Sequence, residues 1–276
     1  MPAGAAYKSI LVHVAADAAC DARLALAVEL ARRSEGRVIG AGGEIFYGGL
    51  SAPGGYMDAK TVQMLLEYAQ ERLDRAGARF MAAAAAAGVP AVWRGRLERP
   101  ETVIADEARG ADLIVASQHG GAGADEPPID PGELIMAGGL PVLVVPPDVD
   151  RLAARRILLG WKNTLQARSA ISVALPLLTA ADAVEVVRIA DDEANAQVEL
   201  ADVAERLRLH GVKVSCAAER RERRAVAQSL VDRARNHNAD LIVAGAYAQP
   251  RLHQWVFGGV TRDLLARSTL PVLYAR

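Results

Sequence analysis

The chain has 276 residues and a mass of 29.2 kDa, a length that fits two domains or one large one. A hydrophobic fraction of 51% and a charged fraction of 24% exclude a disordered chain, a collagen-like fibre and a coiled coil. The net charge of −1 combines an acidic first half and a basic second half, since residues 1–150 contain 13 Lys and Arg against 20 Asp and Glu. The acidic half would repel duplex DNA, which is therefore not expected as a partner.

Short apolar runs alternate with helical periodicity along the first half of the chain. Strands are expected near residues 8–14, 37–42, 90–95, 112–116 and 141–145, and helices near residues 18–34, 58–87, 100–109 and 132–138. The glycine-rich stretch Glu44–Asp58 is interpreted as a loop insertion. It suits either a mobile flap or a plain long loop.

A second series of alternating elements follows the linker Pro146–Asp150. Strands are expected at Arg156–Trp161, Ala183–Ile189, Val212–Cys216, Asp240–Gly245 and Pro271–Ala275, and helices at Leu165–Thr179, Ala194–His210, Ala225–Asn236 and Gly258–Arg267. Thr164 is expected to cap the first of these helices, and Gly211 to end the second in a left-handed conformation.

The two series are copies of one unit. Three blocks recur in the same order: Ala111–Ser117 as Ala239–Gly245, Leu140–Val144 as Leu270–Tyr274, and Ser9–Val12 as Arg156–Leu159. We therefore predict two domains, residues 1–147 and 148–276, each a five-stranded parallel sheet covered by helices on both faces. Ligands of such sheets bind at the carboxyl ends of the strands.

Several classes of site are excluded by their missing motifs. Neither first strand is followed by GxGxxG, and no GxxxxGK[ST] loop occurs. The two cysteines and five histidines lack metal-ligand spacing, so no metal site is expected. Ser117 follows a strand but lacks the GxSxG elbow, and is interpreted as structural. No catalytic residue is therefore predicted.

The most informative loop lies in the second copy. It reads Gly245-Ala246-Tyr247-Ala248, then nine residues, then Gly258-Gly259-Val260-Thr261. Glycines after a strand and at the start of a helix let backbone N–H groups approach an anion, and the helix N-terminus adds partial positive charge. The loop therefore suits phosphate, although a pair of ordinary turns would have the same spacing.

This loop resembles that of the universal stress protein family, whose nucleotide-binding members carry G-x2-G-x9-G-[S/T] after the fourth strand. Asn238–Val243 before the loop and Ser268–Leu273 after it also match, and the resemblance covers both copies. It implies a tandem universal stress protein with the adenine nucleotide alpha hydrolase-like fold. It further implies a stress-response role, ATP as the ligand with Mg2+ as a possible companion, and pairing of the two copies through their last strands.

The sequence also departs from the family's motif. Ala248 replaces the second glycine, and Gly259 replaces the Ser or Thr. Lys162 stands where binding members usually have an aspartate that faces adenine, so that contact is lost, or is made by backbone carbonyls, or Lys162 attracts phosphate instead. The candidate nucleotide-binding residues are Trp161, Lys162, Ile189, Gly245, Ala248, Gly258, Gly259, Val260 and Thr261.

The first copy departs further and is expected to bind no nucleotide. Asp130 puts negative charge where phosphate would sit, Pro131 has no N–H group, and Ala15 takes the position of the family's aspartate. In the second copy, the arginines of Arg220–Arg224 could reach a triphosphate tail, or they form a solvated helix start.

Three functions remain open for the chain: a nucleotide-responsive regulatory module, a ligand-free interaction scaffold of the same fold, and a slow ATP hydrolase. For hydrolysis, Asp191 and Asp192 are only remote candidates for the acid or base. Expected partners are a second copy of the chain or an unknown protein, not nucleic acid or a membrane. Since no spanning or export segment is recognised, a cytoplasmic location is expected.

Overall fold

The computed structural model describes residues 7–17, 19–45, 58–118, 129–221, 225–246 and 259–276. The first half contains β1 (Ser9–His13), α1 (Cys20–Arg33), β2 (Arg37–Gly43), α2 (Ala59–Ala86), β3 (Ala91–Arg96), α3 (Pro100–Glu107), β4 (Leu113–Ser117), α4 (Pro131–Ala137) and β5 (Val142–Val145). A single 3-10 turn, Ala108–Gly110, follows α3.

The second half repeats this order of elements. It contains β6 (Arg156–Gly160), α5 (Leu165–Ala180), β7 (Ala183–Ala190), α6 (Glu193–Leu209), β8 (Val214–Arg220), α7 (Val226–Asn236), β9 (Leu241–Gly245), α8 (Gly259–Arg267) and β10 (Val272–Ala275). The predicted alternation of strands and helices is confirmed in both copies.

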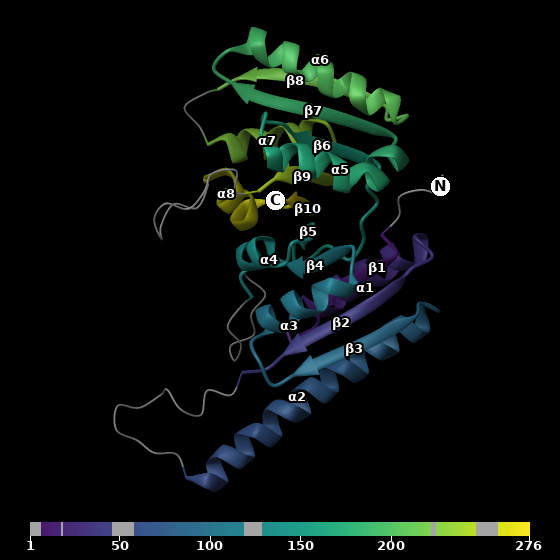
Figure 1. Cartoon of the computed structure of the whole chain (residues 1–276), viewed down its shortest axis with the longest axis vertical. Coiled ribbons are helices and arrows are strands. Elements are labelled where there is room, and N and C mark those ends of the chain that lie inside the picture. The colour runs from purple at the N-terminus through teal and green to yellow at the C-terminus, as the bar shows by residue number, and fades with distance from the viewer. Residues whose placement is uncertain (1–6, 18, 46–57, 119–128, 222–224, 247–258) are drawn as a thin grey trace.

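All the strands belong to one sheet, in the order β3-β2-β1-β4-β5-β10-β9-β6-β7-β8, which runs the length of the molecule (Figure 1). Every neighbouring pair is parallel except β5 and β10, which pair antiparallel with Leu143 opposite Leu273. The last strands of the two copies therefore lie side by side, where the sequence analysis expected them to meet. The two five-stranded sheets form one continuous sheet.

The helices bury one apolar layer on each face of this sheet. One core cluster includes Leu24 of α1, Phe80 of α2, Ile171 of α5 and Leu200 of α6. The other draws on the helices α3, α4, α7 and α8. The inner strands β1, β4, β5, β6, β9 and β10 are covered on both sides and are mostly apolar on both faces, as the sequence predicted, whereas the edge strands β3 and β8 carry charged residues.

The third strand of the second half differs from its prediction, Val212–Cys216. The N–H groups of Gly211 and Val212 donate to the carbonyls of Arg208 and Leu207 (2.8 and 3.1 Å), so these residues close α6 instead of starting a strand. Gly211 has φ +78°, the left-handed conformation expected of it. β8 then continues to Arg220, because β7 extends to Ala190 and pairs with it there.

The first half has a longer second helix as well as the predicted insertion. α2 has 28 residues against 17 in α6, and Figure 1 shows it extending past the sheet. Residues 46–57 of the insertion lie outside the described residues, so the choice between flap and plain loop is not tested. No helix of the described segments is long and apolar enough to cross a membrane.

An aspartate in the recurring block ties two strands together in each half. Asp112 accepts hydrogen bonds from the backbone N–H groups of Lys8 and Ser9 (2.8 and 2.9 Å). Asp240 does the same for Arg155 and Arg156 (2.9 and 3.1 Å). The recurrence of Ala-Asp-Leu-Ile-Val-Ala is thus explained by a structural role of its aspartate.

Replacing Asp240 with Ala is expected to lower the free energy of unfolding by about 2 kcal/mol, because two backbone donors lose a charged acceptor. Denaturant unfolding measures the change. Asp182→Ala is the matched control, since Asp182 makes only an exposed ion pair with Arg155 (3.4 Å) and should change stability by under about 0.5 kcal/mol. Equal losses for the two variants would contradict the role given to Asp240.

Candidate functional site

The sheet of the second half has a point where the strand connections diverge. From β6 the chain crosses to β7 on one side, whereas β9 lies on the other side of β6. Ligands of open α/β sheets bind at the carboxyl ends of strands at such a switch point. The carboxyl ends of β6 and β9 are neighbours there, at the end of the sheet where the sequence predicts a site.

Gly245, the last residue of β9, is needed for packing. A Cβ atom at this position would lie 2.6 Å from the backbone nitrogen of Ala167 and 2.7 Å from the carbonyl carbon of Gln166. The start of α5 therefore approaches the end of β9 too closely for any side chain. This contact accounts for the first glycine of the motif without a ligand.

Gly259, the first residue of α8, has no such constraint. In the described part of the chain, a Cβ atom at Gly259 would meet nothing within 4 Å. The neighbouring Val260 is 38% exposed, and Thr261 is 5% exposed and packs into the protein. Among the described residues, no neighbour therefore requires glycine at this position, and the start of a helix presents backbone N–H groups that can bind an anion. Ala248 and Gly258 lie outside the described residues.

The loop after β6 carries an exposed positive charge. The ammonium group of Lys162 has no partner among the described residues, and the side chain is exposed. Asn163 accepts a hydrogen bond from Arg168 through its side-chain oxygen (2.8 Å). Thr164 caps α5 as predicted, accepting from the N–H of Ala167 (3.3 Å). The loop therefore offers a free cation beside an ordered helix start.

Trp161 and Ile189, two of the predicted site residues, lie on opposite faces of the sheet. Trp161 is 8% exposed and belongs to the core cluster on the α5–α6 face. Ile189 is partly buried and packs against the cluster on the α7–α8 face. Residues of α8 pack on that second face, so Ile189 and α8 lie on the same side of the sheet, whereas Trp161 is buried on the other side.

The equivalent point of the first half is filled by Arg23 of α1, which is 1% exposed. Its guanidinium donates to the carbonyl oxygen of His13 (2.6 Å), to the carboxylate of Asp17 (2.8 Å) and to the hydroxyl of Ser117. These three groups come from the ends of β1 and β4 and from the loop after β1. We call Arg23, Asp17 and Ser117 the first-half plug.

The second half carries small residues where the first half places these groups. Aligning the recurring strand and the buried positions of α1 and α5 pairs His13 with Gly160 and Arg23 with Ala170, and the recurring block pairs Ser117 with Gly245. Sequence reasoning missed the plug because Arg23 lies within an otherwise ordinary amphipathic helix. Comparison of the two copies could have predicted the plug, because Arg23 of the first copy aligns with Ala170 of the second.

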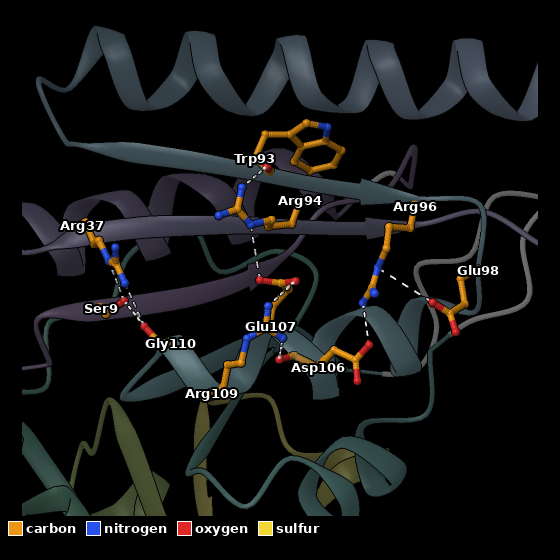
Figure 2. Close-up of polar contacts among 10 residues, drawn as sticks. All are labelled: Ser9, Arg37, Trp93, Arg94, Arg96, Glu98, Asp106, Glu107, Arg109 and Gly110. Carbon is orange, nitrogen blue, oxygen red and sulfur yellow. Dashed lines mark hydrogen bonds and ion pairs between the residues drawn. The ribbon is translucent and has the colours of Figure 1, made fainter.

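Three arginines on the α3 face of the first half lie beside carboxylates, whereas Arg37 donates to Ser9 and to the carbonyl of Gly110. Figure 2 shows Arg94 beside Glu107 (3.4 Å) and Arg96 beside Asp106 (2.8 Å), with Arg109 also reaching Glu107. The charges of Arg94, Arg96 and Arg109 are thus compensated within the fold.

In the second half, the ion pairs between the equivalent helix and its strands have the opposite arrangement: the strands carry the acidic residues and the helix the basic one. Here the helix α7 supplies the cation, Arg233, whose guanidinium donates to Glu185 of β7 (2.8 Å) and pairs with Glu219 of β8 (3.2 Å). The hydrogen bond from Arg233 holds the pKa of Glu185 below its ordinary value. These pairs are structural, because they join each helix to the strands beneath it.

The remaining candidates lie farther from the switch point. Arg220 ends β8, three strand spacings from β9, which is about 14 Å at the usual inter-strand distance. That separation favours the solvated interpretation of Arg220 and Arg221 over contact with a phosphate bound at β9, whereas residues 222–224 lie outside the described residues. Asp192 caps α6 by accepting from the N–H of Asn195 (3.1 Å). Among the described residues, no group of three or more His, Cys, Asp or Glu side chains could hold a metal ion.

The fold and the switch points define an α/β sheet protein of two repeated halves, of the kind that binds ligands at strand ends. Residues 153–276 match the model of the Universal stress protein family. The whole chain resembles a universal stress protein from Archaeoglobus fulgidus DSM 4304, with a TM-score of 0.72, 16% identity, and coverage of 97% of this chain and 96% of that one. A functionally unknown protein from Pseudomonas aeruginosa PAO1 has a TM-score of 0.58 and 19% identity, with coverage of 98% and 92%.

A shorter similarity is found in a curated protein. A stretch of 50 residues is 40% identical to the stress response protein NhaX of Bacillus subtilis (strain 168), and spans 18% of this chain and 30% of that protein. Residues 153–276 therefore belong to the universal stress protein family, and the chain as a whole has that family's fold.

Proposed function

We propose that the chain is a stress-response regulatory module that binds one nucleotide, such as ATP, at the switch point of its second half. The observation that carries this proposal is the contrast between the halves. A buried arginine closes the first switch point, whereas the second has Gly160, Ala170 and Gly245 at the matching positions. The second half thus lacks the buried guanidinium of the first, and the backbone N–H groups at the start of α8 suit an anionic ligand.

The presence of glycine at position 259 is a second, independent argument for the same proposal. Glycine lowers helix stability, and no contact with the part of the chain that the structure describes requires one at this position. Access of phosphate oxygens to the N–H groups of α8 would explain its presence. Any Mg2+ would then enter with the phosphates it accompanies.

The alternative is a ligand-free interaction scaffold of the same fold. It draws on Lys162 in place of the family's aspartate and on the packing role found for Gly245. The two functions differ in one measurable property, which is the presence of a nucleotide bound at one per chain.

The first experiment identifies any small molecule that the protein retains on purification, by mass spectrometry after denaturation. Calorimetric titration with ATP, with and without magnesium, follows on the same sample. One nucleotide per chain supports the proposal. An empty protein that also ignores added nucleotide contradicts it and favours the scaffold.

Gly259→Asp separates binding from stability. An aspartate at the start of α8 is expected to leave stability unchanged or to raise it by about 0.5 kcal/mol through the helix dipole. The same charge should repel phosphate and weaken ATP binding at least about tenfold, a change of about 1.4 kcal/mol.

The matched control for this charge is Ala225→Asp. Ala225 precedes α7 and provides no side-chain cap, so the variant adds the same charge at a neighbouring helix start. It should leave nucleotide affinity nearly unchanged. Equal weakening by both variants would show that only net charge matters, and would argue against a phosphate at α8.

A further inference from the structure

The outer side of α2 carries an exposed stripe of residues with heptad spacing. The side chains that α2 buries against the sheet, among them Leu73, Ala76 and Phe80, lie on the other side of the helix. Positions separated in turn by four and three residues are all exposed: Met64, Tyr68, Glu71, Arg75, Ala78, Ala82 and Ala85. We call these seven residues the α2 stripe. This spacing is the one by which one helix packs along another.

The position of α2 makes this stripe accessible to another molecule. Figure 1 shows the helix at one end of the protein, beyond the edge strand β3. The stripe extends over about six turns of the helix. The equivalent helix of the second half, α6, has 17 residues against 28, so a contact along α6 would be little more than half as long.

The sizes of the side chains in the stripe are complementary to those of a second α2 that runs in the opposite direction. When the two helices cross at position 73, Met64 of one copy faces Ala82 of the other. Tyr68 likewise faces Ala78, so a large side chain meets a small one at each of these levels. The twofold axis that relates the copies repeats every pair. The large residues in the first half of α2 therefore match the alanines in its second half.

The charges in the middle of the stripe match in the same register, because Glu71 of one copy faces Arg75 of the other. Among the described residues, the carboxylate of Glu71 has no ion-pair partner, and the guanidinium of Arg75 donates only to the backbone carbonyl of Glu71 in its own helix (3.3 Å). Arg79, which lies on the side of α2, instead pairs with Asp21 of α1 (2.6 Å). A second copy would thus supply the opposite charge that Glu71 and Arg75 each lack within the described part of their own chain.

We propose that two copies of the chain associate through the α2 stripe, with their two helices antiparallel. The last strands cannot serve this contact, because β5 and β10 pair with each other within one chain. The edge strand β3 carries Arg94 and Arg96, and charged residues on an edge strand oppose pairing with another strand. The inference goes beyond the proposed function and is independent of it, since the contact requires no nucleotide.

Sedimentation of the full chain over a dilution series tests this inference. The unaltered protein is expected to reach twice its mass of 29.2 kDa. Glu71→Arg and Arg75→Glu each place like charges opposite one another at two symmetric points, and each should weaken association at least about tenfold. An equimolar mixture of the two variants should associate again, because every Arg of one chain then faces a Glu of the other. The double variant, Glu71→Arg with Arg75→Glu, should also associate.

Glu205→Arg is the matched control, because Glu205 is an exposed glutamate of α6. It should leave association unchanged. A monomer in the unaltered protein, or a dimer that the two single variants leave intact, would overturn the inference. Single variants that dissociate but do not associate again when mixed would also overturn it, because the register predicts their recovery. Loss of association in Glu205→Arg as well would overturn it in favour of a contact between α2 of one copy and α6 of the next.

Discussion

Arg23→Met is expected to lower the free energy of unfolding by about 3 kcal/mol, because removing one partner of a buried ion pair leaves the other charge without compensation. Arg23 is 1% exposed and Asp17 is 12% exposed. The variant also removes the donor that serves the His13 carbonyl and the Ser117 hydroxyl. Methionine keeps most of the side-chain volume, so the loss reflects the polar contacts more than a cavity.

Denaturant unfolding of three variants tests this prediction. Arg79→Met is the matched control, because Arg79 pairs with Asp21 at the surface, where the two side chains are 39% and 76% exposed. It should change stability by under about 1 kcal/mol. Combining Arg23→Met with Asp17→Asn should recover part of the loss, since the stranded carboxylate is then neutral. If Arg23→Met behaves like Arg79→Met, the first-half plug does not stabilise the fold.

The strands, helices and repeat were predictable because their signals are local. Apolar periodicity set the position of most elements to within a residue or two, and the caps at Thr164 and Gly211 follow from side-chain and backbone chemistry within one helical turn. The end of β8 was not predictable in this way, because Ala217–Arg220 become a strand only by pairing with β7.

The candidate site was predicted less completely, because its decisive contacts are long-range. Arg23 and Ser117 are 94 positions apart in the sequence, and neither residue type by itself predicts their hydrogen bond. The need for glycine at position 245 likewise comes from the start of α5, a distant segment. Glycine spacing alone could not distinguish that packing role from phosphate binding, whereas the structure gives a packing reason for Gly245 and, among the described residues, none for Gly259.

His13 should make stability depend on pH. Burial, reinforced by the nearby Arg23 cation, holds the pKa of His13 well below its ordinary value, so the folded protein keeps this imidazole neutral. The unfolded chain takes up a proton at its ordinary pKa of about 6.5. The stabilisation is therefore complete above that pH and is lost as the pH falls below it, by up to about 1.4 kcal/mol per pH unit.

His13→Leu is expected to flatten this dependence between pH 7.5 and 5, since leucine is of similar size and has no proton to bind. His13 also has a buried ring nitrogen, Nε2, without a hydrogen-bond partner among the described residues, so leucine removes an unsatisfied polar atom. Denaturant unfolding at several pH values measures the slope, and His210→Gln, at an exposed position, is the control that should keep it. Parallel curves for His13→Leu and the unaltered protein would show that His13 is not the buried neutral group responsible. His237, whose pKa burial also lowers, would then be the next histidine to replace.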